Sequence, residues 1–262
     1  YDLAGVEIRS VWETQPHDLS KAQVAELKQI LDDHGLAVSC IASPFFKCDI
    51  WDERAYKNHL DILRRCIGLG QELGTKLIRG FTFWITENTP KVWGEVDRVY
   101  KEDVIPILEA ENALLGIENE HDTTAATAKL TGEFLGRLDH PRVRGIWDTA
   151  NEVFAAGGER PYPEAYERMA PYIAHVHVKD AFHDEDGKAQ VALIGEGAVD
   201  FAGQFRALEE AGYDGYVSLE THWRHAKLPE DLLKRPGGGA FSEAGEAASR
   251  RCLEVLTRLA AR

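Results

Sequence analysis

The sequence predicts an α/β protein of the (β/α)₈ TIM barrel class, built as one domain over residues 1–262. Short apolar runs alternate with longer amphipathic stretches, and the starts of successive runs lie 31, 40, 38, 29, 31 and 42 residues apart. Each interval is wide enough for a helix and two loops, so the strands should be parallel and joined by helical crossovers. The length of 262 residues also suits one barrel of about 250 residues.

Seven strands are predicted, each rich in Val, Ile or Leu. They are Gly5–Arg9, Leu36–Ile41, Lys76–Gly80, Leu114–Glu118, Val143–Asp148, Ala174–Val178 and Tyr216–Glu220. A closed barrel of this class needs an eighth strand. We therefore expect that the first strand and helix of the complete protein precede the given chain. An open or seven-stranded barrel is the alternative.

Several helices have clear end signals. Ser20 can cap a helix over Lys21–His34 that Gly35 ends, and Gly74 ends a second helix over Ala55–Leu73. Further helices are predicted over Pro163–Ala170, Phe201–Ala211 and Glu243–Ala261, and the Pro-Gly-rich segment Arg235–Gly239 is predicted to be a loop.

Composition narrows the class of partner. The formal charge is −14, from 44 acidic and 30 basic side chains, and such a surface repels nucleic acids and anionic membranes. The four cysteines form no CxxC pair, so buried free thiols in a reducing cytoplasm are expected. No apolar run approaches 18 residues. A small-molecule partner is therefore favoured, and the sequence leaves a homo-oligomer open.

Polar and charged side chains lie at or just past the end of nearly every predicted strand. In a parallel barrel the C-terminal ends of the strands form the functional face, and buried charges are costly unless they are paired or bound to a metal. The residues are Glu7, Arg9, Ser43, Lys47, Arg79, Glu118, Asn119, Glu120, His121, Asp148, Asn151, His175, His177, Lys179, Asp180, Glu220 and His222.

Four of these residues end successive apolar runs and are the candidate ligands of one divalent metal ion: Glu118, Asp148, His177 and Glu220. Three carboxylates and one imidazole suit Mn²⁺, Mg²⁺ or Co²⁺ better than a thiolate-seeking metal, and Zn²⁺ is a further alternative. A strand-end salt bridge or cap explains each residue taken alone. The four together, in this order, favour a metal site, with Mn²⁺ as the expected ion.

Several segments resemble the xylose-isomerase-like sugar phosphate isomerase/epimerase superfamily. They are Ile117-Glu118-Asn119-Glu120-His121, Trp147-Asp148-Thr149-Ala150-Asn151, His175-Val176-His177-Val178-Lys179-Asp180, Gly195-Glu196-Gly197-Ala198-Val199-Asp200 and residues 212–222. Each motif is weak by itself, but the ordered set spans the chain from the first predicted strand to the last.

The resemblance implies one divalent metal held by the same four residues, and it implies roles in proton transfer. In tagatose-epimerase-like members the two metal-bound glutamates, here Glu118 and Glu220, also exchange protons with the substrate. Other members carry a catalytic histidine two residues after the first of these glutamates, where this chain has Glu120, followed by His121. Asn151 stands where tagatose-epimerase-like members carry a histidine, which weakens that particular assignment.

The remaining candidates are expected to contact the substrate: Arg79, Lys47, Lys179, His222 and Asn151. Three of them have a structural alternative. Lys179 can pair with Asp180, and Arg79 or Lys47 can form a salt bridge with an acidic neighbour. His222 follows Glu220 by two residues, so the strand period places both on one face. His175 is expected to be a hydrogen-bonded core histidine, and ordinary loop packing accounts for most of the aromatic residues past the strand ends.

A cation bound to adjacent carbonyl and hydroxyl oxygens stabilises an enediolate, so a carboxylate can remove and return a neighbouring proton. The sequence therefore favours an isomerase or epimerase of a small ketose, ketosugar or polyol. The alternative is a dehydratase on the same scaffold, of the inosose or dehydroshikimate type. A DNA-repair endonuclease fits the acidic charge poorly, and a non-catalytic sugar-binding barrel is disfavoured by the intact set of ligands.

Overall fold

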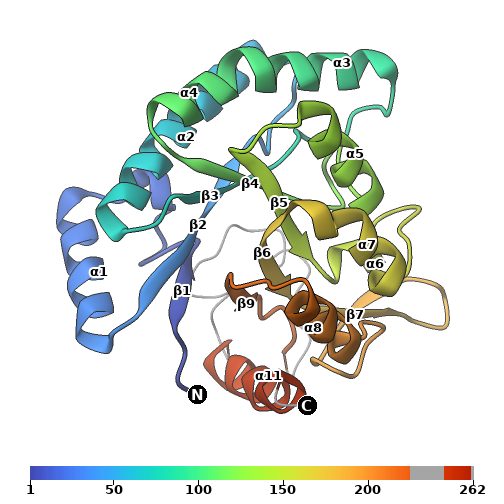
Figure 1. Ribbon diagram of the computed structural model, residues 1–262. Coiled ribbons are helices and arrows are strands. Elements are labelled where there is room, and N and C mark those ends of the chain that lie inside the picture. Colours follow the sequence, from blue (N-terminus) through green and yellow to red (C-terminus); the bar gives the residue numbers. More distant parts are fainter. Residues whose placement is uncertain (225–244, 261–262) are drawn as a thin grey trace.

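The computed structural model describes residues 1–224 and 245–260, which form a nearly closed barrel of parallel strands surrounded by helices (Figure 1). The sheet runs in the order β1-β2-β3-β4-β5-β6-β9, so β1 and β9 are its two edges. The strands are β1 (Gly5–Ile8), β2 (Ala37–Phe45), β3 (Leu77–Gly80), β4 (Leu114–Glu118), β5 (Val143–Asp148), β6 (Ile173–Val178) and β9 (Val217–Leu219). All seven predicted strands are confirmed, and no eighth barrel strand lies among the described residues.

The barrel helices lie outside the sheet, and most follow the strand-to-helix order that the spacing predicts (Figure 1). They are α1 (Lys21–His34), α2 (Glu53–Leu73), α3 (Pro90–Val99), α4 (Ile105–Ala110), α5 (Ala128–Leu138), α6 (Asn151–Phe154), α7 (Tyr166–Met169), α8 (Phe201–Glu210) and α11 (Gly245–Ala260). The short turns of helix are η1 (Pro16–Asp18), η2 (Tyr100–Val104), η3 (Pro161–Ala165) and η4 (Ala170–Tyr172).

The ends of α1 show how the local sequence defines a helix. Ser20 and Gln23 form a reciprocal capping box at its N-terminus, which satisfies backbone donors that the helix leaves unpaired. Gly35 ends it with φ of 63°, a left-handed conformation that costs glycine little. The predicted bounds of α1 are confirmed, whereas α2 begins two residues earlier than predicted, because Asp52 caps it.

Two later helices lie close to the positions that the sequence predicts. The helix expected over Pro163–Ala170 is present, although the type of helix changes along it from η3 to α7 and then η4. The backbone at Tyr162, just before it, is not helical. The last predicted helix is present from Gly245 as α11. Residues 243, 244 and 261, and the loop predicted over Arg235–Gly239, lie outside the described residues.

A β-hairpin that the sequence reading did not predict follows β6 directly. It consists of β7 (Asp180–His183) and β8 (Ala189–Ala192), which pair antiparallel. The carboxylate of Asp184 accepts hydrogen bonds from the backbone N–H groups of Asp186 and Lys188, which closes the turn between the two strands. The hairpin extends the chain beyond the end of β6, where the candidate site begins.

Side chains along each strand point alternately toward the surrounding helices and into the lumen of the barrel. Outward-facing residues such as Leu115 and Trp147 pack with the helices in the main hydrophobic core. Inside the barrel, Cys40, Leu77 and Ile146 form a small apolar cluster, and an added Cβ at Gly116 would lie 2.6 Å from Ile146 Cγ1. The inward residues nearer the C-terminal strand ends are charged, so the lumen is apolar at one level and ionic at the next.

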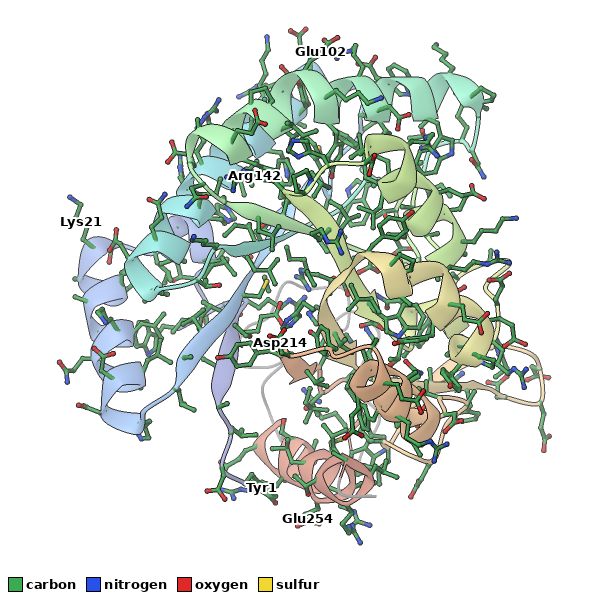
Figure 2. The ribbon with its side chains drawn as sticks, viewed as in Figure 1. Tyr1, Lys21, Glu102, Arg142, Asp214 and Glu254 are labelled. Atoms are coloured by element: carbon green, nitrogen blue, oxygen red, sulfur yellow. The ribbon has the colours of Figure 1, made fainter. Side chains whose placement is uncertain are left out.

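The outer surface is rich in charge. Figure 2 shows Lys21, Glu102 and Glu254 pointing away from the barrel, and all three are exposed. The four cysteines are free and buried, which confirms that prediction. Among the described residues, no helix has both the length and the apolar character that crossing a membrane requires.

Candidate metal centre

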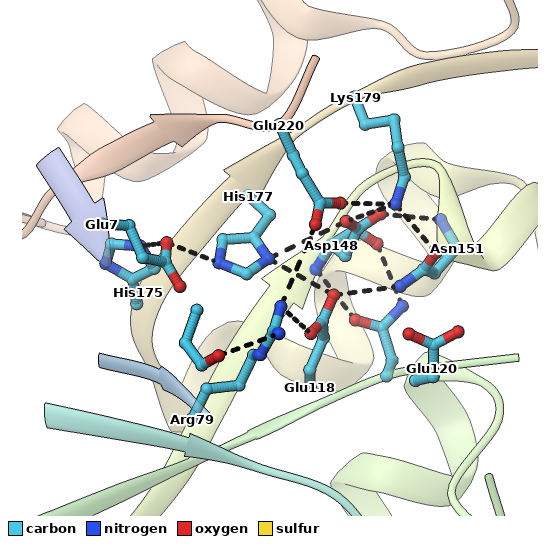
Figure 3. Close-up of polar contacts among 12 residues, drawn as sticks. Glu7, Arg79, Glu118, Glu120, Asp148, Asn151, His175, His177, Lys179 and Glu220 are labelled. Carbon is cyan, nitrogen blue, oxygen red and sulfur yellow. Dashed lines mark hydrogen bonds and ion pairs between the residues drawn. The ribbon is translucent and has the colours of Figure 1, made fainter. Parts of the chain in front are cut away.

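The four candidate ligands converge at the C-terminal mouth of the barrel (Figure 3). Glu118 and Asp148 end β4 and β5, His177 lies on β6, and Glu220 follows β9 directly. Asp148 and His177 are register partners across β5 and β6, which places them side by side. One ligand atom from each of the four lies within 4.8 Å of all the others. The predicted convergence is therefore present, and the cluster could hold a divalent cation.

The cluster is buried and strongly charged. Glu118, Asp148 and His177 are 1%, 0% and 2% exposed, and the side chain of Glu220 is 23% exposed. Three carboxylates this close repel one another and lose hydration, so they require compensating positive charge.

Two basic side chains supply part of that charge. Arg79 Nη1 lies 3.1 Å from Glu118 Oε2. Lys179 Nζ lies 2.7 Å from Glu220 Oε2 and 3.1 Å from Asp148 Oδ2. Arg79 was expected to contact the substrate or form a salt bridge, and the salt bridge is present. Lys179 pairs with these two carboxylates rather than with Asp180, whose oxygens accept backbone N–H groups of Gly195, Gly197 and Val199.

The local charges set the protonation of the cluster. Burial opposes ionisation of Glu118, but Arg79 and His177 outweigh it and lower its pKa to about 2. Burial likewise acts against ionised Glu220, but Lys179 and His222 hold its pKa well below the usual value. Burial raises the pKa of Asp148 to about 6, although Lys179 opposes the rise. Glu118 and Glu220 are therefore anionic at neutral pH.

The residues present fit a hard divalent cation. The carboxylate of Asp148 has its Oδ1 held by the backbone N–H groups of Ala150 and Asn151, at 2.9 and 2.7 Å. Its Oδ2 and Glu118 Oε2 are buried, and each lies 3.1 Å from a basic nitrogen, Lys179 Nζ and Arg79 Nη1 respectively. Such oxygens, with one imidazole nitrogen beside them, are the donors that Mn²⁺ or Mg²⁺ binds.

Asn151 connects the acidic and basic parts of the cluster. Its Nδ2 donates to Glu118 Oε1 at 3.1 Å, and its Oδ1 accepts from Lys179 Nζ at 3.1 Å. Because Asn151 is the first residue of α6, just past Asp148, the short helix after β5 positions this amide. An asparagine here can hold two oppositely charged side chains at once.

The other predicted residues lie farther out at the mouth. Lys47 Nζ is 2.9 Å from Glu120 Oε2 and 4.4 Å from the centre of the Phe81 ring. His121 Nδ1 lies 3.2 Å from Glu120 Oε1, and His222 Nε2 lies 3.4 Å from Glu220 Oε2. The structure thus places Lys47, Glu120 and His121 in one group beside the cluster and His222 in contact with it.

A cavity of about 740 Å³ reaches the cluster from the gap between β1 and β9. Glu7, Arg79, His177, Glu220 and His222 line its polar part, and residues of β1, β9 and α11 line its apolar part. This volume is in the range of small-ligand sites. The expectation of loop packing holds for the phenylalanines past the strand ends, which are buried, whereas Trp12 and Trp84 are 45% and 37% exposed.

Glu7 is part of the site, although the sequence suggested for it only a strand-end position and a possible salt bridge with a basic residue. Its Oε2 lies 2.9 Å from His177 Nε2 and 3.2 Å from His175 Nε2 (Figure 3). Burial disfavours the charged form of Glu7, but His177 and His175 hold its pKa well below the usual value. His175 is 1% exposed and hydrogen-bonded, in agreement with the prediction of a core histidine. The position of Glu7 at a strand end was the signal available in the sequence.

A carboxylate-rich cluster with one imidazole at the mouth of a parallel barrel defines a candidate metal enzyme. The chain matches the family model described as "Xylose isomerase-like TIM barrel" over residues 1–254, and it belongs to that family. This confirms the predicted resemblance and the barrel fold.

Similar proteins carry several names. An inosose dehydratase from Serratia proteamaculans is 25% identical over 245 residues, which cover 84% of this chain and 79% of that protein. A xylose isomerase-like TIM barrel protein from Mycobacterium smegmatis, solved in complex with magnesium, has a TM-score of 0.70 at 20% identity, covering 97% of this chain and 84% of that one. D-psicose 3-epimerase from Clostridium cellulolyticum H10 has a TM-score of 0.66 at 19% identity, covering 91% and 85%.

Proposed function

We propose that this protein is a divalent-metal-dependent enzyme that removes a proton from the carbon next to the carbonyl of a small ketose or keto-cyclitol. The observation that carries the proposal is the buried cluster of Glu118, Asp148, His177 and Glu220, whose ligand atoms lie within 4.8 Å of one another. A bound cation, with Mn²⁺ favoured, would polarise substrate oxygens and stabilise the negative charge that develops beside them.

The residues around the cluster have distinct proposed tasks. Glu118 and Glu220 hold the cation and exchange protons with the substrate carbon. Glu220 lines the cavity, whereas Glu118 is fixed by Arg79 and Asn151. Glu120 or His121 is the additional acid or base, at the outer edge of the mouth. The groups proposed to bind substrate oxygens are Arg79, Lys47, Lys179, His222 and Asn151.

The fate of the carbanion decides the reaction. Returning the proton gives isomerisation or epimerisation, the outcome favoured by the sequence alone, whereas expelling a β-hydroxyl gives dehydration. Similarity to an inosose dehydratase extends over 84% of this chain at 25% identity, while the likeness to an epimerase at 19% identity concerns the fold. We therefore propose dehydration of a keto-cyclitol first and epimerisation or isomerisation of a ketose as the alternative.

The test is incubation of Mn²⁺-loaded protein with ketoses and keto-inositols in D₂O, followed by NMR. A new vinylic signal indicates dehydration, and deuterium at a retained carbon indicates isomerisation or epimerisation. We expect Glu118→Gln and Glu220→Gln each to lower turnover by at least about 10²-fold, because a positioned carboxylate contributes about that much to proton transfer.

Glu95→Gln is the matched control, since Glu95 pairs with Arg98 on the outer surface of α3, and it should retain full activity. The proposal would be contradicted if no compound of the panel gave either a vinylic signal or deuterium incorporation. Full turnover in both Glu118→Gln and Glu220→Gln would contradict it as well.

A further inference from the structure

The two ring nitrogens of His177 face different groups. Its Nδ1 lies 3.3 Å from Glu118 Oε1 and 3.9 Å from Asp148 Oδ2, inside the candidate metal cluster. Its Nε2 lies 2.9 Å from Glu7 Oε2, on the opposite side of the ring (Figure 3). The imidazole is 2% exposed and stands between two carboxylates from strands on different sides of the lumen.

Glu7 is placed to fix the orientation of that ring. It lies on β1, and its carboxylate crosses toward β6, where His175 Nε2 also lies 3.2 Å from Oε2. An ionised carboxylate can only accept hydrogen bonds, so His177 donates Nε2–H to it. A bound cation would displace any proton on Nδ1, so the Nδ1 lone pair, directed toward Glu118 and Asp148, would be free to bind it while Nε2–H stays on Glu7.

We propose that Glu7 is a positioning residue of the metal centre, which holds His177 in the orientation and tautomer that present Nδ1 to the cation. The inference rests on the proposed metal-dependent function. Carboxylates commonly orient metal-bound histidines in this way, through the nitrogen that does not bind the metal. Removal of Glu7 would leave the ring of His177 free to turn and its Nε2–H buried without an acceptor.

Glu7, His175 and His177 could alternatively hold a cation of their own, since their ligand atoms also lie within 4.8 Å of one another. That arrangement would use Nε2 of His177 for a second ion. One neutral imidazole has one lone pair, so it can serve either cluster but not both. The cluster with three carboxylates has more charge and more ligands, and we assign the cation to it.

The experiment is calorimetric titration of metal-free protein with Mn²⁺. The unmodified protein should bind one ion per chain. Glu7→Leu should weaken binding about 10- to 100-fold, the range typical of such partners, and Glu7→Gln, which keeps an acceptor oxygen, should weaken it less. Ser39→Ala is the control for loosening of β1, because Ser39 Oγ donates to Val6 O between β1 and β2. It should leave the affinity unchanged.

A second readout detects the tautomer directly. In ¹⁵N-histidine-labelled protein loaded with diamagnetic Zn²⁺, the His177 signal should show a protonated Nε2. The signal is assigned to His177 because it should be missing from the spectrum of the His177→Gln variant. In Glu7→Gln, the Nε2 proton should exchange faster with water. Equal Mn²⁺ affinity in Glu7→Leu and the unmodified protein, two ions per chain, or protonation at Nδ1 would overturn the inference. No Mn²⁺ binding by the unmodified protein would overturn the proposed function as well.

Discussion

Replacing Arg79 by methionine should destabilise the metal-free protein strongly. Arg79 and Glu118 are 7% and 1% exposed, and Arg79 Nη1 lies 3.1 Å from Glu118 Oε2. At that separation two unit charges attract by about 5 kcal/mol for an effective dielectric constant of 20. Removing one partner of a buried pair costs about 3–5 kcal/mol, because the other charge stays buried without compensation. We expect the free energy of unfolding to fall by that amount.

The loss should be smaller when a cation occupies the centre, since the ion supplies positive charge to the same carboxylate. The assay is urea denaturation at pH 7.5, performed once with EDTA and once with saturating Mn²⁺. Arg79→Lys, which keeps the charge, should lose less than Arg79→Met. Arg144→Met is a matched control, because Arg144 lies on β5 and donates to the backbone oxygen of Pro171.

A loss below about 1 kcal/mol for Arg79→Met in EDTA would refute the argument that Glu118 is an ionised carboxylate dependent on Arg79. An equal loss with and without Mn²⁺ would refute the idea that the ion and Arg79 compensate the same charge.

Three further predictions concern the rest of the molecule. All four thiols should react slowly with Ellman's reagent in the folded protein and rapidly in denaturant, because they are buried; fast native labelling would contradict this. Burial lowers the pKa of His59 to about 4, and its Nδ1 accepts a hydrogen bond from Phe46 N–H at 2.8 Å. Below pH 6.5 the unfolded chain therefore binds more protons than the folded one. The free energy of unfolding should be highest above pH 6.5 and fall by about 1–3 kcal/mol as the pH drops toward 4. Denaturation of His59→Gln should show no such pH-dependent loss from this position. Gly132→Ala should destabilise the protein by about 1–3 kcal/mol, because the added Cβ would lie 2.6 Å from the backbone oxygen of Arg168. Gly94 in α3 is exposed with open space around it, so Gly94→Ala should stabilise the protein by about 0.5–1 kcal/mol. Equal shifts of the melting temperature in the two variants would contradict the packing argument.

The strands and the metal cluster were predictable because their signals are local. Each strand is an apolar run that ends in a polar group, and the ends of parallel strands meet at one face of a barrel. Glu118, Asp148, His177 and Glu220 could therefore be grouped although they are far apart in the chain. The caps of α1 were predictable for the same reason, since Ser20 and Gly35 act on their immediate neighbours.

The parts that sequence reasoning missed depend on contacts across the barrel. Glu7 and His177 are separated by 170 positions, and no local pattern joins a carboxylate on β1 to an imidazole on β6. Lys179 and Asp180 are adjacent and of opposite charge, which suggested a pair, but successive residues of extended chain point to opposite sides. Lys179 consequently faces Asp148 and Glu220, while Asp180 binds the backbone around Gly197.

The contact between β1 and β6 has a consequence for the integrity of the fold. β1 is an edge of the sheet, and its backbone ladder connects it to β2. The side chain of Glu7 adds a tether across the lumen, and the atom at its far end belongs to the proposed metal ligand His177. Binding of a cation at the centre should therefore slow amide hydrogen exchange in β1. Local opening of β1 should accordingly be rarer when the cation is bound than when the centre is empty.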